Sequence, residues 1–241
     1  ERIPDLIPKD ALDRDTRLVL VNAIYLKAPW AEPFPKHQTH PEPFHLSGGT
    51  SKPVPTMNAR KHFGFRHQQG FSAITLPYTG GGLQFLVLLP DPGTSLAALE
   101  RSLTAEGLVS CAQIPRVELD LHLPKLHLEP PVMKLGDSLR DLGMTTAFDI
   151  PQGSANFDRM AAQRSKEKLK ISDVFHQTFL DLDEKGTEAA AATAVMMVAT
   201  SAIPTPKPEP IVVRVDRPFL FAIQHRSSGA CLFLGRIVDP R

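Results

Sequence analysis

The sequence predicts an α+β fold in which antiparallel sheets dominate and helices are few. Most apolar segments are short, rich in β-branched residues and bounded by turn signals, which is typical of strands. Few segments carry helical spacing. Proline accounts for 23 of the 241 residues, about twice its usual share of ~5%, which indicates many turns and strand edges. The length fits one large domain or two small ones.

The N-terminal half is expected to be rich in strands. A nearly continuous apolar run over 17–26 contains many branched residues and predicts a buried central strand. Prolines and glycines then divide 33–55 into short segments. Further strands are expected at 63–65, 73–76 and 83–89, with a glycine-rich turn between the last two.

Helical spacing appears in the middle of the chain. Leucines after Ser95 predict a helix over 95–103, followed by a short helix over 105–112 and a third over 132–142 that ends at Gly143. The remaining expected strands are 117–123, 178–183, 211–215, 219–223 and 231–238, with a hairpin turn at 226–230.

Charge and motifs exclude several function classes. The formal net charge of +1 gives no field that favours nucleic acid or an anionic membrane. The sequence contains no Gly-x-Ser-x-Gly elbow, phosphate loop or His-Glu-x-x-His motif. His37, His40 and His45 lie in a proline-rich stretch and are interpreted as solvated loop residues in preference to metal ligands. We therefore expect no enzyme activity, cofactor, metal, nucleic-acid partner or membrane span; the uncharged stretch 189–206 is too weakly apolar for lipid.

The most informative segment runs from Asp183 to Pro210. Its alanine-rich part, 188–203, is compatible with a helix or a flexible linker. A period of two offers a third interpretation, because one face of an extended segment is uncharged and mostly small, and no proline interrupts it before Pro204. That face consists of Thr187, Ala189, Ala191, Thr193, Val195, Met197 and Ala199. Such a segment could add itself to a sheet as a new strand.

The sequence resembles a serpin over essentially all of its length. The motifs that carry the resemblance occur in the family's order: Leu20-Val-Asn-Ala-Ile-Tyr-Leu-Lys-Ala-Pro-Trp30, Phe34, Leu121-His-Leu-Pro-Lys125, Leu142-Gly-Met-Thr-Thr-Ala-Phe-Asp149, Ile171-Ser-Asp-Val-Phe-His176, Asp183-Glu-Lys-Gly-Thr-Glu-Ala-Ala-Ala-Ala-Thr193, Arg217-Pro-Phe-Leu-Phe221 and Leu232-Phe-Leu-Gly-Arg236. The resemblance implies a serpin-like α+β fold with an exposed reactive loop. It also implies a suicide-substrate inhibitor whose cleaved loop inserts into the central sheet and distorts the acylated protease. An extracellular location is expected on the same ground.

The resemblance assigns roles to two groups of residues. Insertion would start at a hinge formed by Glu184, Gly186, Thr187, Glu188, Ala189, Ala190, Ala191 and Ala192. The sheet-opening region would comprise Asn22 and His176 beneath the centre of the sheet, and Trp30, Lys125 and Glu184 at its top. Plainer interpretations stay open: a satisfied core amide, a packed histidine and an exposed ion pair of little value.

The family's nearly constant hinge length also implies the reactive bond. Counting seventeen residues with Glu184 as the first places the reactive bond at Thr200–Ser201. Met196, Met197 and Ala199 are the competing specificity residues. A short residue at this position favours elastase-like or subtilisin-like serine proteases, whereas the methionines would suit chymotrypsin-like enzymes. Trypsin-like targets are excluded because no Arg or Lys occurs between Lys185 and Lys207.

The resemblance covers the C-terminal two-thirds of a serpin. We therefore expect a single serpin domain over 1–241 that lacks the N-terminal part of the fold, with a reactive loop at 184–210 and a stiff proline-rich spacer at 204–210. A non-inhibitory protein of the same fold, acting as a carrier, chaperone or plain protease substrate, is the alternative. The uncharged hinge face favours the inhibitor.

Overall fold

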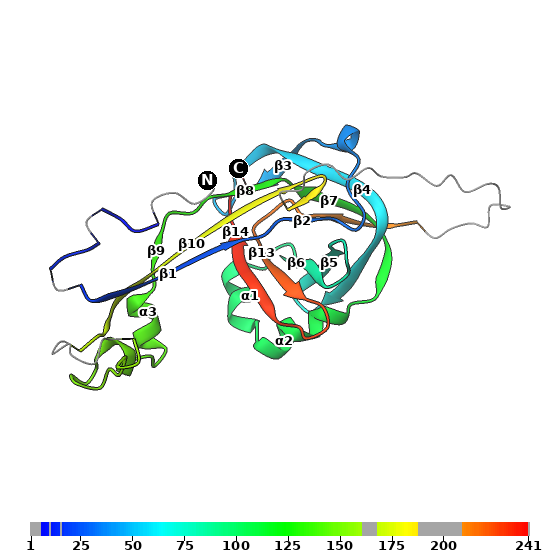
Figure 1. Cartoon of the computed structure of the whole chain (residues 1–241). Coiled ribbons are helices and arrows are strands. Elements are labelled where there is room, and N and C mark those ends of the chain that lie inside the picture. Colours follow the sequence, from blue (N-terminus) through cyan, green and yellow to red (C-terminus); the bar gives the residue numbers. More distant parts are fainter. Residues whose placement is uncertain (1–5, 10, 15, 161–167, 188–208, 241) are drawn as a thin grey trace. The chain divides into compact units, whose positions relative to one another are not determined.

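The computed structural model describes residues 6–9, 11–14, 16–160, 168–187 and 209–240. The chain divides into two compact units, unit 1 with residues 1–26 and 128–180, and unit 2 with residues 27–127 and 181–241. Strands joined mostly by antiparallel pairing dominate, and the helices are short (Figure 1). The predicted α+β class is confirmed, whereas the expectation of a single domain stays a prediction.

Unit 1 is built on one long strand. Strand β10 (Ile171–Asp183) pairs in parallel with β1 (Leu18–Tyr25) and antiparallel with the short β9 (Met133–Lys134). Strand β8 (Leu126–Leu128), which spans the boundary between the units, also pairs with β10. Helix α3 (Gly136–Asp141) and the 3-10 turn η3 (Thr146–Phe148) complete the unit. Its small core is formed by Phe148, Ile171 and Val174, with Leu18, Leu135 and Leu139 packed against them.

Two expectations about unit 1 were wrong. The strand over 17–26 is present, but it is not buried, since Leu20 and Val21 are 41% and 47% exposed. Among the described residues, β10 is its only pairing partner, and the core reaches only its first residue. The helix expected over 132–142 begins at Gly136, because residues 133–134 pair with β10 instead; its end at Gly143 agrees with that residue's φ of 97°.

Unit 2 contains a sheet of eight strands. Their order is β12-β7-β4-β5-β6-β13-β14, and β3 pairs with β4. The strands are β3 (His40–His45), β4 (Ser51–Gln68), β5 (Phe71–Pro77), β6 (Leu83–Pro90), β7 (Arg116–Pro124), β12 (Ile211–Arg214), β13 (Phe219–His225) and β14 (Cys231–Ile237). The strands expected from 73 onward in this unit are confirmed within a few residues.

The expected strand at 63–65 is confirmed as part of β4, whereas β3 and the start of β4 were not predicted from the sequence. The proline-rich stretch 33–55 was expected to form short segments, yet it holds the short η1 turn (Lys36–Gln38), β3 and the start of the long, curved β4 (Figure 1). The prolines pair with each other across the ladder, Pro41 with Pro55 and Pro43 with Pro53. Such pairs fit only where the ladder needs no backbone donor, so the prolines cost no hydrogen bond between the two strands.

Two short helices cover one face of this sheet. Helices α1 (Leu96–Ser102) and α2 (Ala105–Ser110), followed by the turn η2 (Cys111–Gln113), are capped by hydroxyl groups: Ser95 accepts from the Ala98 amide at 3.2 Å and Thr104 from the Gly107 amide at 3.0 Å. They pack on β5, β6 and β13 (Figure 1), with Leu99 among the buried residues Ala73, Leu86, Leu88, Leu220 and Ala222. No described helix is long and apolar enough to cross a membrane.

A polar row crosses four strands of the sheet. The Glu42 carboxylate accepts hydrogen bonds from Asn58 Nδ2 at 2.8 Å, His122 Nδ1 at 2.8 Å and Arg214 Nη1 at 3.1 Å. Burial alone raises the pKa of Glu42, but these hydrogen bonds and the charge of Arg214 outweigh it and hold the pKa below its ordinary value of 4.5. His40 bonds to Asn58 at 2.9 Å. His40 and His45 thus belong to β3 and not to a loop, and the described residues hold no metal-ligating group of three.

The lowered pKa of Glu42 predicts a pH-dependent contribution to stability. Its stabilisation is full above pH 4.5 and is lost as the pH falls through the lowered value in the folded protein. Glu42→Gln, which cannot titrate, should therefore lower the free energy of unfolding by about 1–3 kcal/mol at pH 7 and by much less in acid. Urea unfolding at both pH values measures the difference. The matched Glu106→Gln, on the exposed face of α2, should stay within about 0.5 kcal/mol; a gap that persists undiminished in acid contradicts the assignment.

Candidate hinge site at the end of β10

A tight turn follows β10 in unit 2. The Asp183 carboxylate accepts hydrogen bonds from the amides of Lys185 at 2.7 Å and Gly186 at 3.3 Å. This side-chain-to-backbone pattern is the reason that aspartate favours turns. The chain reverses, and strand β11 (Gly186–Thr187) pairs antiparallel with the last two residues of β10.

Strand β11 lies between the last residues of β10 and a second short strand. Gly186 pairs with Pro29 and Thr187 with Ala28, both from β2 (Ala28–Pro29), on the side opposite β10. Gly186 has a φ of 145°, and a Cβ atom there would lie 2.3 Å from the Ala28 carbonyl oxygen. The position therefore requires glycine for its backbone conformation and for space.

Trp30 holds this turn in place. Its backbone amide donates to the Lys185 carbonyl at 2.8 Å, and its indole N–H donates to the Asp183 carbonyl at 2.9 Å. The ring is 2% exposed and stacks on Tyr78 with centroids 4.7 Å apart and planes 6° apart. Trp30 thus connects the turn to the aromatic core of unit 2.

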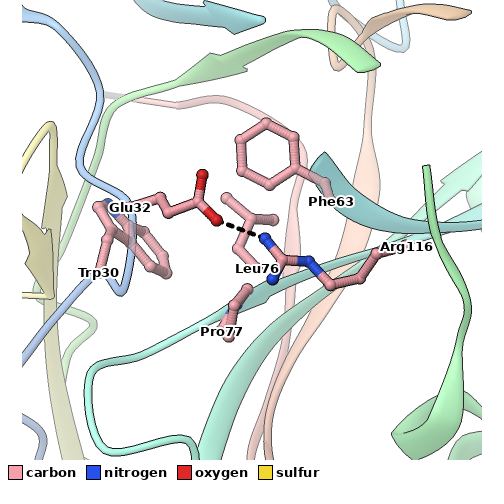
Figure 2. Close-up of a pocket in the computed structure, with 6 residues that line it drawn as sticks. All are labelled: Trp30, Glu32, Phe63, Leu76, Pro77 and Arg116. Carbon is pink, nitrogen blue, oxygen red and sulfur yellow. Dashed lines mark hydrogen bonds and ion pairs between the residues drawn. The ribbon is translucent and has the colours of Figure 1, made fainter. Parts of the chain in front are cut away.

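Figure 2 shows a pocket beside the same tryptophan. The Glu32 carboxylate lies next to the indole ring and points toward Arg116, with which it forms an ion pair at 2.5 Å. Arg116 Nε also donates to the His62 carbonyl at 2.9 Å. Leu76, Pro77 and Phe63 form the apolar part of the lining. The pocket beside Trp30 thus combines an ion pair with an apolar lining.

The next contact is one that sequence reasoning missed. Tyr78 Oη and Thr187 Oγ1 lie 2.6 Å apart, and the two residues are 1% and 0% exposed. Burial raises the pKa of Tyr78, more than the hydrogen bond to Thr187 lowers it, so the phenol stays neutral and keeps its proton. The two residues are 109 positions apart, and no local pattern links them; the only signal was an aromatic residue directly before a glycine-rich turn.

The turn also contains one member of a charged pair. Lys125 Nζ donates to Glu184 Oε2 at 3.1 Å, and Glu184 is a buried residue. Burial alone would raise the pKa of Glu184, but its own backbone amide and the Lys125 ammonium bind the ionised carboxylate and hold the pKa below 4.5. The alternative of an exposed ion pair of little value does not fit this burial.

Asn22 and His176 meet in unit 1. They face each other across the parallel pairing of β1 and β10, and His176 Nδ1 donates to Asn22 Oδ1 at 3.0 Å. Asn22 is exposed and His176 half-buried, so neither is a core residue among the described part of the chain. This bond is one that must break if β1 and β10 separate. Their role in sheet opening stays a prediction.

The structure therefore brings together five of the sequence-predicted residues around the turn in unit 2: Trp30, Lys125, Glu184, Gly186 and Thr187. The other hinge residues, Glu188, Ala189, Ala190, Ala191 and Ala192, and the expected reactive bond Thr200–Ser201 lie outside the described residues. Of the reactive loop at 184–210, only its two ends are described.

Comparison with known proteins places the chain among its relatives. A family model described as "Serpin (serine protease inhibitor)" matches residues 1–240. Serpin B10 of Sorex araneus is 35% identical over 99% of the chain and 59% of its own length, and human serpin B9 is 37% identical over 99% and 62%. A structure of human thyroxine-binding globulin complexed with thyroxine superposes with a TM-score of 0.80 at 27% identity, and the match covers 98% of the present chain and 59% of the globulin. The chain thus spans about three fifths of the length of the curated relatives it matches.

The fit of Gly186 predicts that any side chain displaces β11. Gly186→Ala puts a methyl group against the backbone of β2, at a cost of about 1–3 kcal/mol, and should change the emission of Trp30, the only tryptophan in the sequence. Gly49→Ala is the matched control, because Gly49 has a φ of 80° but open space around it. It should be mildly destabilised with unchanged Trp30 emission. Equal emission spectra for both variants would show that β11 tolerates the methyl group.

Proposed function

Because the chain belongs to the serpin family, we propose that it acts as a suicide-substrate inhibitor of serine endopeptidases. One observation carries the proposal: Gly186 and Thr187, close to the start of the loop, already form a strand between β10 and β2. The inward-facing residue Thr187 is uncharged and buried. A strand that has already begun needs only to be extended, and the uncharged face of 187–199 is suited to that.

In the proposed mechanism, the protease attacks the reactive bond and becomes acylated. Cleavage releases the N-terminal part of the loop from its C-terminal anchor, β12, which stays paired in parallel with β7. The released part then extends β11 antiparallel to β10, and His176 and Asn22 separate to admit it. The free energy for this extension comes from a native fold that is kinetically trapped. Inhibition requires the extension to be faster than hydrolysis of the acyl bond.

We propose Thr200–Ser201 as the reactive bond, with elastase-like or subtilisin-like proteases as targets. The support is the length of the segment from Glu184 and the absence of Arg and Lys between 185 and 207 in the sequence. A small β-branched residue fits a shallow specificity pocket, whereas a trypsin-like pocket recognises a cation.

A carrier function is the second candidate. Thyroxine-binding globulin, a structural neighbour, is described in complex with thyroxine. Unit 2 has a mostly apolar open cleft between α1, α2 and β14, lined by Leu103, Leu108, Leu220, Leu234 and Gly235. Concave apolar surfaces of this kind accept small hydrophobic ligands. An inserting loop and a carrier cleft can be tested separately.

Incubation of the protein with elastase-like, subtilisin-like and chymotrypsin-like enzymes should yield a covalent complex between the protein and a protease that survives a denaturing gel. Thr187→Arg should be cleaved with little complex formed, because burying an unpaired guanidinium costs several kcal/mol; the stoichiometry of inhibition should rise at least about tenfold. Thr187→Ser, which keeps the hydroxyl, is the matched control and should still form complex. Cleaved product without complex for the unmodified protein, across all three enzyme types, favours the carrier or plain-substrate alternative.

The position of the reactive bond has its own test. Acylation at Thr200 should release a C-terminal peptide that starts at Ser201, and mass spectrometry of the denatured complex identifies it. A peptide that starts at Val198 or earlier refutes the count from Glu184, and a start at Val198 or Met197 assigns the bond to Met197 or Met196. Chymotrypsin-like targets would then replace the elastase-like ones.

A further inference from the structure

We propose that Tyr78 is a positioning residue for loop insertion: its hydroxyl binds Thr187 and keeps the start of the loop in the sheet before any protease has cut. The inference deepens the proposed inhibitory function and rests on it. Tyr78 comes from the end of β5, outside the segments that define the hinge and the reactive bond.

The first step of the argument is that the seat for β11 is closed around two residues. Gly186 fits against the backbone of residues 28–30 with no space for a side chain, and Thr187 has no exposed surface. Both residues pair on each side, with β10 and with β2. Gly186 and Thr187 therefore already occupy an inserted position in the uncut protein.

The second step is that Tyr78 supplies the polar partner that makes this position tolerable for threonine. A buried hydroxyl without a partner is costly, whereas one that is hydrogen-bonded adds modest stability. At 2.6 Å, the phenol and the threonine hydroxyl satisfy each other. The stack on Trp30 and the bond from Thr79 Oγ1 to the Trp30 carbonyl at 3.0 Å fix the position of the phenol ring.

The third step concerns what the hydroxyl decides. If Thr187 left its place, insertion after cleavage would have to begin by burying it again, while the acyl bond is exposed to water. A hinge that is already seated removes this delay and fixes which residue of the loop faces inward, because a shift by one residue turns every side chain to the other face. Tyr78 therefore influences how acyl-enzyme divides between trapping and hydrolysis, without contacting the protease.

A double-mutant cycle tests the proposal. Tyr78→Phe leaves the Thr187 hydroxyl buried without a partner, and Thr187→Val leaves the phenol without one; Tyr78→Phe/Thr187→Val removes both hydroxyls and keeps the shapes. Each single variant should exchange the amides of residues 186–187 about tenfold faster and raise the stoichiometry of inhibition. The double variant should return both quantities toward the unmodified values, because neither partner is left unsatisfied.

The readouts separate positioning from a merely structural role. If Tyr78 only supports Trp30, Thr187→Val cannot rescue Tyr78→Phe, and additive effects would overturn the proposal. Coupled amide exchange with an unchanged stoichiometry of inhibition would overturn it as well. Should the unmodified protein form no complex with any protease, the inhibitory function fails, while coupled exchange would still support the seating of Thr187 by Tyr78.

Discussion

Two carbonyl groups of the turn after β10 accept hydrogen bonds from a single residue, Trp30, which lies 153 positions before Asp183 in the chain. The indole N–H and the backbone N–H of that residue bind the turn at two points, so its orientation is set. The pairing of β11, the close fit of Gly186 and the contact between Thr187 and Tyr78 all depend on this orientation. The N–H of a buried tryptophan is normally hydrogen-bonded. Here its partner is the Asp183 carbonyl, so the bond that satisfies the indole also fixes the turn.

The site combines aromatic packing with a buried, ion-paired carboxylate. Trp30 stacks on Tyr78 and also contacts Phe85 edge-on, with the centroids of the Trp30 and Phe85 rings 6.0 Å apart. Glu184, which is buried, forms an ion pair with Lys125. The aromatic side supplies packing that does not depend on pH, whereas the carboxylate is retained in its charged form by specific donors. The turn is thus held by two kinds of interaction that respond to different conditions.

Local patterns predicted strands that carry either an alternation of apolar and polar residues, as in 117–123, or a continuous apolar run, as in 219–223. Trp30, Lys125 and Glu184 were identified only through the family resemblance, whose motifs contain these residues. The local patterns located 63–65 within β4 but failed for β3 and the proline-rich start of β4, because a proline count cannot distinguish a loop from a strand in which the proline nitrogens face away from the partner strand. Local patterns could not predict the exposure of β1 or the partner of Thr187. Both depend on which distant segments of the chain come into contact, and neighbouring positions in the sequence carry no signal of that.

The proline pairs between β3 and β4 have a consequence for association between molecules. Because Pro41 and Pro43 lie opposite prolines, the backbone nitrogens at these positions face the outer edge of β3, where they have no hydrogen to donate. The next donor on that side, the His45 amide, is already bound to the Asp216 carbonyl at 2.7 Å. A foreign strand arriving at this edge would meet acceptors only. A protein whose proposed action depends on accepting a new strand at one place thus blocks strand addition along the edge of β3.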